Sequence, residues 1–363
     1  MKPGYGPPHP AAVLLIAEPL HAGPAALYAQ NLMAGLSRAG IYHPLLTPAA
    51  PGLSLLPKEE LKFVQAATGL EWLQWRPFVF SRIVAWARQQ EAELIHGISE
   101  KAAPVCAALA ETLNLPCVLS VHDYLGGALG LSGRIRAVIA PSEPMREHLV
   151  NDADVPKERV RVIAPGVHIP LLRKSAPRAP GEPEAKLIVS IGDFNQSSDY
   201  ATFMEAVRVI ADKQGEGCSF VVSGEGPQES GLRKFVRELK LDKRVTFCHG
   251  HTEQDGLLSE ADVYVQTTRR EGFAVHALQA MALGVPVVAA VNGAVLELIE
   301  DGVTGYLVPP ADFAMLSERI LTLLNDAALR EKIGTAARAA AIAQFSAERM
   351  VEATVGVYRE VLG

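Results

Sequence analysis

Short apolar runs alternate with helix-patterned segments along most of the chain, and this alternation limits the fold more than any other feature. In the first half the apolar runs are AVLLIAE (12–18), ELIHG (93–97), PCVLSVHD (116–123) and RVRVIAPG (159–166). Helical spacing separates them, as in AALYAQNLMAGLSRAG (25–40). Parallel strands need helical crossovers, and strands covered on both faces are apolar throughout. The first half therefore predicts a doubly wound α/β domain.

A change of composition at 169–186 divides the chain. IPLLRKSAPRAPGEPEAK contains four prolines and no period, which is typical of a linker. The alternation restarts with KLIVSIGD (186–193), so a second domain of the same class follows, and ligands of such sheets bind at the carboxyl ends of the strands. The predicted fold is α/β, with two Rossmann-like doubly wound parallel-sheet domains facing a cleft. The predicted segments are an N-terminal domain 1–170, a linker 171–185, a second domain 186–344 and a last helix 345–363.

Composition excludes several classes of protein. The chain has 363 residues, 49% of them hydrophobic and 20% charged, as in ordinary globular proteins with large cores. The net charge of −6 argues against a nucleic-acid partner. No run of about 18 apolar residues and no positively headed leader is present. Cys106, Cys117, Cys218 and Cys248 lack metal-ligand spacing, so buried reduced thiols and a cytoplasmic location are expected.

Residues 55–90 break the alternation and contain all three tryptophans, Trp72, Trp75 and Trp86. Pro77 separates two predicted helices, because proline lacks the amide that a helix interior needs. Two interpretations stay open. The aromatic and basic side chains form an acceptor pocket or rest on a membrane surface, or a helix pair simply packs on the sheet. The first interpretation makes Trp72 and Trp75 acceptor-side candidates and predicts peripheral membrane contact.

The stretch EGFAVHALQAMALGVPVVAAVNGAVLELIEDGVTGYLVPPAD (271–312) carries the most specific pattern. It resembles the signature of the retaining glycosyltransferases of family four, the group 1 glycosyltransferases, which have the GT-B fold. RAVIAPSEPMREHLV (136–150) resembles another family segment, and FSAERMVEATVGVYREVL (345–362) resembles the last helix, which in this family packs back on the N-terminal domain. The resemblance implies that the second domain binds a nucleotide-diphosphate sugar as the donor substrate.

The resemblance places the donor site at the start of the helix predicted near 274–283. The first amides of that helix, near Phe273, Ala274 and Val275, would lack intrahelical acceptors and form an anion site for a diphosphate. Glu271 would bind hydroxyls of the transferred sugar, since a carboxylate can accept two hydrogen bonds. Gln279 stands where the family has the glutamate that binds the ribose. The donor-binding candidates are Gly23, Gly192, Asp193, Gly250, Arg270, Gly272, Phe273, Ala274, Val275 and Gln279.

Two histidines follow or end strands of the first domain. His122, in SVHD, matches the histidine that faces the donor sugar in several family members. A neutral imidazole there could accept from a sugar hydroxyl and support developing positive charge. The alternative is an ordinary hydrogen-bonded histidine at a strand end. His122 and Glu271 are therefore the catalytic candidates, and His96 in LIHG is an acceptor-side candidate.

The chain departs from the family pattern at the donor phosphates. Asp193 stands where the family usually carries arginine, and Ser198 stands at the position of a lysine. Hydrogen bonds to charged groups contribute about 1.5–3 kcal/mol each, so losing both weakens donor binding by roughly two to four decades. Arg269 and Arg270 could compensate, since arginine binds phosphate well. A solvated arginine pair on a loop is the alternative.

Two functions therefore stay open. The first is a retaining hexosyltransferase-type enzyme that moves a sugar from a nucleotide-diphosphate donor to a glycan, lipid or small-molecule acceptor. It needs no metal or other cofactor, because the helix dipole and side chains would neutralise the phosphate. The second is a catalytically degenerate GT-B protein that acts as partner or scaffold of an active transferase, because a fold does not secure a function. A phosphorylase or epimerase of similar fold is a minor third alternative.

Overall fold

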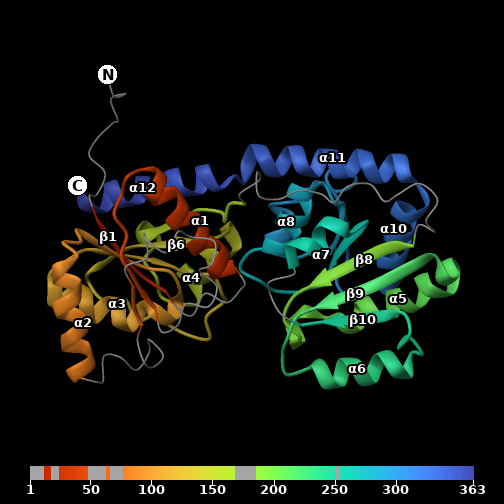
Figure 1. Ribbon diagram of the computed structural model, residues 1–363, viewed down its shortest axis with the longest axis horizontal. Helices are drawn as coiled ribbons and strands as arrows, with labels where there is room; N and C mark the ends of the chain where they lie inside the picture. The colour runs from red at the N-terminus through yellow and green to blue at the C-terminus, as the bar shows by residue number, and fades with distance from the viewer. Residues whose placement is uncertain (1–11, 18–23, 48–62, 66–76, 168–184, 250–253) are drawn as a thin grey trace. The chain divides into compact units, whose positions relative to one another are not determined.

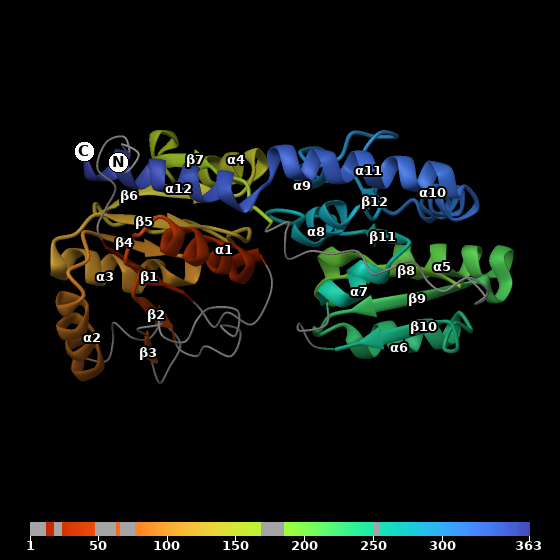
Figure 2. The same cartoon turned by 45° about the horizontal axis from the view of Figure 1, so that its top comes forward.

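The computed structural model describes residues 12–17, 24–47, 63–65, 77–167, 185–249 and 254–363. The chain forms two compact units, one of Met1–Gly166 with Ala347–Gly363 and the other of Val167–Ser346. Each unit contains one parallel sheet with helices packed on it (Figures 1 and 2). The predicted α/β class with two Rossmann-like sheets is therefore confirmed.

The sheet of the first unit has seven strands in the order β3-β2-β1-β4-β5-β6-β7, all parallel. Three central strands read VLLI, LIHG and CVLS, and every residue in them is buried. Strands with helices on both faces have no solvent side, which explains these continuous apolar runs. The strands are β1 Val13–Ile16, β2 Leu45–Thr47, β3 Phe63–Gln65, β4 Leu94–Gly97, β5 Cys117–Ser120, β6 Ile135–Ala140 and β7 Val160–Val162.

The first unit also contains the last helix of the chain. This helix, α12, packs along α1, which is the first helix in sequence (Figures 1 and 2). The two helices lie close together at Gly35 of α1, because a Cβ added there would lie 2.4 Å and 2.6 Å from the two methyl carbons of Val351. The helices are α1 Pro24–Arg38, α2 Pro77–Gln89, α3 Ala103–Leu113, α4 Glu143–Asn151 and α12 Ala347–Leu362, with 3-10 turns η3 Glu100–Ala102 and η4 Lys157–Arg159.

This packing predicts opposite effects for two glycine substitutions. Gly35→Ala should lower the free energy of unfolding by about 1–3 kcal/mol, because the new methyl group forces Val351 and α12 away. Gly356→Ala is the matched control, since nothing lies within 4 Å of a Cβ added there in α12. Replacing that helical glycine should stabilise the protein by about 0.5–1 kcal/mol. Denaturant unfolding measures both, and equal stability of the two variants would contradict the packing.

The prediction of a helix pair over residues 55–90 is wrong at residues 63–65, the part of its first half that the structure describes. Phe63–Gln65 forms the edge strand β3, which pairs in parallel with Leu45–Thr47. A short apolar run gives no periodicity that distinguishes strand from helix, and only the neighbouring strand decides. Its second half is a helix, α2, with Pro77 at the first position, where the missing amide costs nothing.

The sheet of the second unit has six parallel strands in the order β10-β9-β8-β11-β12-β13. The order reverses between β8 and β11, and ligands of open α/β sheets bind outside the carboxyl ends of the strands at such a point. The strands are β8 Lys186–Ile191, β9 Cys218–Ser223, β10 Val245–Cys248, β11 Val263–Gln266, β12 Val287–Ala290 and β13 Tyr306–Val308. The helices are α5 Tyr200–Gln214, α6 Glu229–Glu238, α7 Gln254–Glu260, α8 Val275–Leu283, α9 Gly293–Leu296, α10 Phe313–Asn325 and α11 Ala327–Gln344, with 3-10 turns η6 Gln196–Ser198 and η7 Gly215–Gly217.

The C-terminal end of helix α8 is packed against another helix of the second unit, α11. Gly284 takes the left-handed conformation (φ 76°) and its amide bonds back to Met281, which closes the helix. Gly334 of α11 touches this turn, since a Cβ added to it would lie 2.1 Å from the Gly284 carbonyl oxygen. The donor site is therefore predicted at the start of a helix whose other end is firmly packed.

The cysteines largely match the prediction of buried reduced thiols. Cys106, Cys117 and Cys218 are buried free thiols, and Cys248 is half-buried. Among the described helices, none has the length and apolar character needed to cross a membrane.

Candidate functional site

The loops after β8 and β9 form the base of the site in the second unit. Gly192 directly follows β8, and its amide donates to the Ser223 carbonyl of β9 over 3.0 Å. Gly224 directly follows β9. Its backbone lies so close to the loop after β8 that an added Cβ would be 2.0 Å from the Gly192 carbonyl oxygen. Farther out, the amide of Phe194 donates to the Glu225 carbonyl over 2.8 Å. The two loops are therefore joined backbone to backbone at the carboxyl edge of the sheet.

Glu271 lies at the same edge, in the loop that follows β11. Its Oε1 accepts hydrogen bonds from the side-chain amides of Gln266 and Asn292, the latter over 3.0 Å. The side chain is half-buried. Burial raises the pKa of Glu271 to about 7, and the two hydrogen bonds offset only part of this effect. Near neutral pH the carboxyl group therefore exists in both protonation states.

Asn292 links the Glu271 carboxyl group to the backbone around it. Its Nδ2 also donates to the Thr268 carbonyl over 2.7 Å, and its Oδ1 caps α9 by accepting from the Val295 amide over 3.0 Å. Neither Asn292 nor Gln266 was predicted from the sequence. A signal existed for Gln266, because it is a polar residue that ends the buried strand VYVQ.

The start of α8 differs from the prediction. Gly272, Phe273, Ala274 and Val275 are buried, and Phe273 packs against Phe345 with ring centroids 6.0 Å apart. The Val275 amide donates over 3.0 Å to the carbonyl of Phe273, which precedes α8, so this amide is less available to an anion than predicted. Ala274, at φ −82° and ψ 67°, forms the inverse γ-turn that closes this bond. The amides of Phe273 and Ala274 have no acceptor among the described residues.

Asp193 and Ser198 occupy the loop after β8 in different ways. Asp193 is exposed at the edge of the sheet. Ser198 is buried, and its hydroxyl donates to the Asp193 carbonyl over 2.6 Å. Ser198 thus closes its own loop rather than offering a group to a ligand. A carboxylate, and no lysine, stands where the resemblance expects two cations.

Arg269 does not supply the expected compensation. Its Nε and Nη2 both donate to Oδ2 of Asp199, over 3.0 Å and 2.8 Å. Asp199 is held in a left-handed conformation (φ 48°) at the start of α5 and also accepts from Thr202 over 2.8 Å. Arg269 therefore ties β11 to α5. Arg270 is exposed, which keeps it as a candidate for binding phosphate.

Gln279 lies on the first turns of α8, half-buried. Its Oε1 accepts from the Nδ1 of His276 over 3.0 Å. A carboxamide oxygen has two lone pairs, so this contact leaves the donor-binding role of Gln279 as a prediction.

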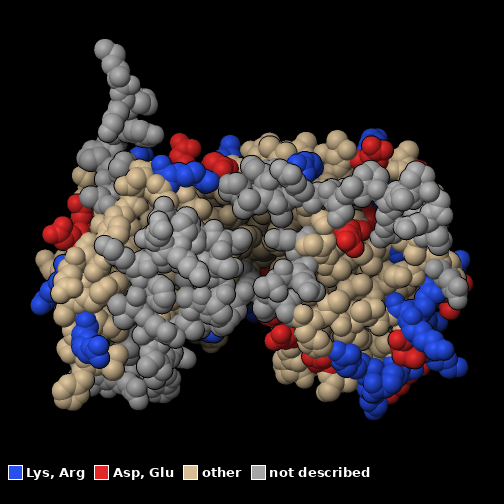
Figure 3. All heavy atoms as spheres, viewed as in Figure 1, with Lys and Arg blue, Asp and Glu red and all other residues tan. Residues whose placement is uncertain are grey.

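A cluster of charged and aromatic side chains lies where β10 ends. The Nε2 of His249 and the Nε of Arg233 each lie 2.8 Å from Oε1 of Glu229. The Arg233 guanidinium stacks 4.2 Å from the centroid of the Phe247 ring. Both partners lower the pKa of Glu229, Arg233 more strongly than His249. Figure 3 shows that lysine and arginine side chains gather around α6, which carries Arg233.

His122 lies in the first unit, two residues after β5, and is buried. Neither ring nitrogen makes a hydrogen bond with the described residues. The ring lies against Tyr28, with centroids 5.1 Å apart. Burial lowers the pKa of His122 to about 4, and the Ile98 carbonyl opposes this shift without a bond of normal geometry. The imidazole is therefore neutral at pH 7, with two polar atoms that no described residue satisfies.

The placement of His96 contradicts its assignment as an acceptor-side residue. It is fully buried in β4, where Nδ1 bonds the Tyr358 hydroxyl (2.6 Å) and Nε2 bonds the Ser120 hydroxyl (2.8 Å). Burial lowers the pKa of His96 to about 3, and repulsion by His122 adds to this shift. His96 joins β4 and β5 to α12, so its role is structural. The burial of His96 depends on α12, which is distant in sequence, so the sequence around His96 does not predict it.

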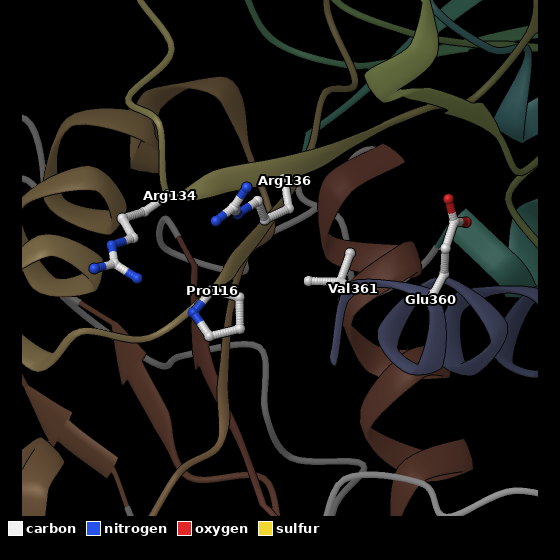
Figure 4. Close-up of a pocket in the computed structure, with 5 residues that line it drawn as sticks. All are labelled: Pro116, Arg134, Arg136, Glu360 and Val361. Carbon is white, nitrogen blue, oxygen red and sulfur yellow. The ribbon is translucent and has the colours of Figure 1, made fainter. Parts of the chain in front are cut away.

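One cavity lies away from both candidate sites, and four predicted residues are not among those that the structure describes. Gly23, Gly250, Trp72 and Trp75 fall outside the described residues. A cavity of about 430 Å³ is found where β5 and β6 begin, at the edge opposite to the carboxyl ends of these strands (Figure 4). It is not part of either candidate site. Its lining residues are Pro116, Arg134, Arg136, Glu360 and Val361.

Comparison with known proteins identifies relatives of both units. The family described as "Glycosyl transferases group 1" matches residues 173–340, and "Glycosyltransferase Family 4" matches residues 25–169. The α-D-kanosaminyltransferase of Streptomyces kanamyceticus is 26% identical over 62% of this chain. The N-acetyl-α-D-glucosaminyl L-malate synthase of Bacillus anthracis is 27% identical over 49% of it. The matched regions span 60% and 46% of the lengths of these two relatives.

Solved structures share the fold over nearly the whole chain. The Anabaena protein HepE in complex with UDP-glucose superimposes with a TM-score of 0.82 and 21% identity, covering 97% of this chain and 100% of that chain. A sucrose-phosphate synthase from Thermosynechococcus elongatus gives a TM-score of 0.78 at 19% identity, with 96% and 98% covered. At these identities the likeness concerns the fold alone.

Proposed function

Because the chain belongs to the group 1 glycosyltransferases with the GT-B fold, we propose that it transfers a sugar from a nucleotide-diphosphate donor. The acceptor would be a glycan, a lipid or a small molecule. The curated relatives include two enzymes named for the transfer of amino sugars, and one structural neighbour is described as a complex with UDP-glucose. These names support a nucleotide sugar as the donor class.

The observation that carries the proposal is the placement of Glu271. It lies at the carboxyl end of β11, beside the point where the strand order of the second sheet reverses. Gln266 and Asn292 fix Oε1, while Oε2 makes no hydrogen bond with the described residues. A carboxylate held in this way is preorganised to bind sugar hydroxyls through its second oxygen. Donor binding is therefore assigned to this edge of the second unit.

The proposed reaction retains the configuration of the sugar. The bond between the anomeric carbon and the donor phosphate breaks, and a bond from that carbon to the acceptor oxygen forms on the same face. The acceptor proton passes to the leaving phosphate oxygen. His122 is the proposed polar contact of the reacting sugar, because its neutral imidazole can stabilise oxocarbenium character and its two nitrogens make no hydrogen bond with the described residues. We propose that no metal takes part.

A non-catalytic partner or scaffold is the second candidate, and specific residues favour it. Asp193 exposes a carboxylate, Ser198 is bonded within its own loop, and Arg269 is paired with Asp199. Negative charge near a diphosphate site weakens the binding of that ligand. The two candidates therefore differ in whether the protein binds a nucleotide at all.

A nucleotide panel separates these candidates. Calorimetry with UDP, GDP, ADP, CDP and TDP, and with the sugar conjugate of whichever binds, should show micromolar affinity for one base. Glu271→Ala should weaken binding of the sugar conjugate by about tenfold or more, since a charged hydrogen bond contributes about 1.5–3 kcal/mol. Glu318→Ala, on the exposed side of α10, is the matched control. Absence of binding across the panel would support the scaffold.

A further inference from the structure

The loop that follows His122 needs an external anchor. It connects β5 to β6 and reads DYLGGALGLSGR from 123 to 134, with four glycines. Glycine restricts the backbone least, so such a loop has little conformational preference of its own. A Cβ added at Gly126, Gly127, Gly130 or Gly133 would meet nothing within 4 Å, so these positions are not packed. The position of His122 must therefore be fixed from outside the loop.

His148 of α4 supplies such an anchor. Its side chain is buried, and Nε2 accepts a hydrogen bond from the Leu125 amide over 2.9 Å. Nδ1 lies 2.8 Å from Oδ2 of Asp152, one turn farther along. Because Nε2 accepts, the proton of the neutral ring sits on Nδ1 and is donated to Asp152. The Tyr124 ring packs on the imidazole, with centroids 4.8 Å apart.

The backbone of His122 is held from a second direction. Its amide donates to Oε2 of Glu100, in the turn after β4, over 3.4 Å. Its imidazole makes no hydrogen bond with the described residues, so nothing but packing orients the ring itself. The orientation of His122 then depends on where its backbone is placed. Only two residues separate it from Leu125, whose amide His148 holds.

We propose that His148, held in one tautomer by Asp152, is a positioning residue for His122. This inference rests on the proposed function for its catalytic meaning, but the placement itself is independent of activity. His148 would act through the Leu125 amide, without contacting a substrate. The alternative is that His148 is an ordinary satisfied core histidine whose loss loosens the unit as a whole.

The test compares His148→Phe with His148→Gln in the full-length protein. Phenylalanine keeps the ring against Tyr124 but removes the acceptor, whereas glutamine places an oxygen near the position of Nε2. Hydrogen exchange of peptides covering Leu125 should be about two- to tenfold faster in His148→Phe, the effect of one lost hydrogen bond, and close to wild type in His148→Gln. Asp152 has a side chain that is 64% exposed, so Asp152→Ala folds readily and should give a smaller change in the same direction.

Histidine NMR separates a positioning role of His148 from general loosening of the unit, because it reports on His122 and His96 individually. With carbon-13 at histidine Cε1, the His122 signal, identified by its absence in His122→Asn, should shift in His148→Phe and return in His148→Gln. The signal of His96, which is buried and bonded to Ser120 and Tyr358, should not move in either variant. An unchanged His122 signal, or equal shifts of His96 and His122, would overturn the proposal. Failure of the nucleotide panel would instead remove only the catalytic meaning of the placement.

Discussion

Glu271→Gln should stabilise the protein at pH 8 and leave its stability nearly unchanged at pH 4.5. Burial raises the pKa of this carboxyl group to about 7, compared with an ordinary value of 4.5. Glutamine keeps an oxygen that accepts from Gln266 and Asn292 but carries no charge at any pH. The variant therefore removes the cost of ionising a half-buried group while it preserves the hydrogen bonds.

The pH window follows from the direction of the shift. Below pH 4.5 the carboxyl group is protonated in both the folded and the unfolded protein, so it does not affect stability. Between about 4.5 and 7 the unfolded chain releases the proton more readily, and stability falls as pH rises. Above pH 7 the cost is complete. One pKa unit corresponds to about 1.4 kcal/mol, and partial exposure reduces the total to about 1–3 kcal/mol.

Thermal unfolding at pH 4.5 and pH 8 measures this difference. The gain for Glu271→Gln at pH 8 should raise the midpoint by about 4–8 °C for 2 kcal/mol in a unit of this size. Glu229→Gln is the matched control, because Glu229 is also half-buried but Arg233 and His249 lower the pKa of its carboxyl group. It should give no gain at pH 8. A pH-independent effect of Glu271→Gln would show that burial does not govern this carboxyl group.

A stabilising substitution at Glu271 would also bear on function. A group that costs stability in the unliganded protein persists only where another requirement keeps it. A solvated helix cap would carry no such cost. The predicted gain from Glu271→Gln is therefore a test of the site that needs no knowledge of the sugar or the acceptor.

The parts of the site that could be predicted from sequence are those that a local pattern determines. The runs KLIVSIGD and ADVYVQTT predict strands, and parallel strands end at one edge, so Gly192 and Glu271 could be assigned to the same edge before any coordinates. The end of α8 was equally readable, because Gly284 follows the last apolar turn. These features need no information from elsewhere in the chain.

The parts that were missed depend on distant residues or on single torsion angles. Asn292 lies 21 residues from Glu271, and His96 is bonded to Tyr358 across 262 residues. No spacing rule relates such pairs, because the fold alone brings them together. The γ-turn at Ala274 depends on one ψ angle, so the bond that occupies the Val275 amide could not be read from composition.

Asp193→Arg should tighten the binding of a nucleoside diphosphate by about 10- to 100-fold. Asp193 is exposed in the loop after β8, and the neighbouring Gly192 is held by its own bond to Ser223, so the substitution leaves the loop intact. The change removes a repulsive carboxylate and adds a donor to phosphate, and one charged hydrogen bond contributes about 1.5–3 kcal/mol. Ser198 is left unchanged, because its hydroxyl closes the loop through the Asp193 carbonyl.

Two further variants separate local from general electrostatics. Asp193→Ala removes only the repulsion and should give a smaller gain than Asp193→Arg. Asp212→Arg makes the same change of net charge on a side chain that is 73% exposed near the end of α5, and it should have little effect at 0.15 M salt, where screening acts within about 8 Å. If Asp193→Arg binds UDP no better than Asp212→Arg, the diphosphate does not lie beside β8, and the scaffold hypothesis gains over the enzyme. If only the substitutions at position 193 increase the affinity for UDP, the chain has a working donor site, and Asp193 lowers the affinity of that site for the nucleotide.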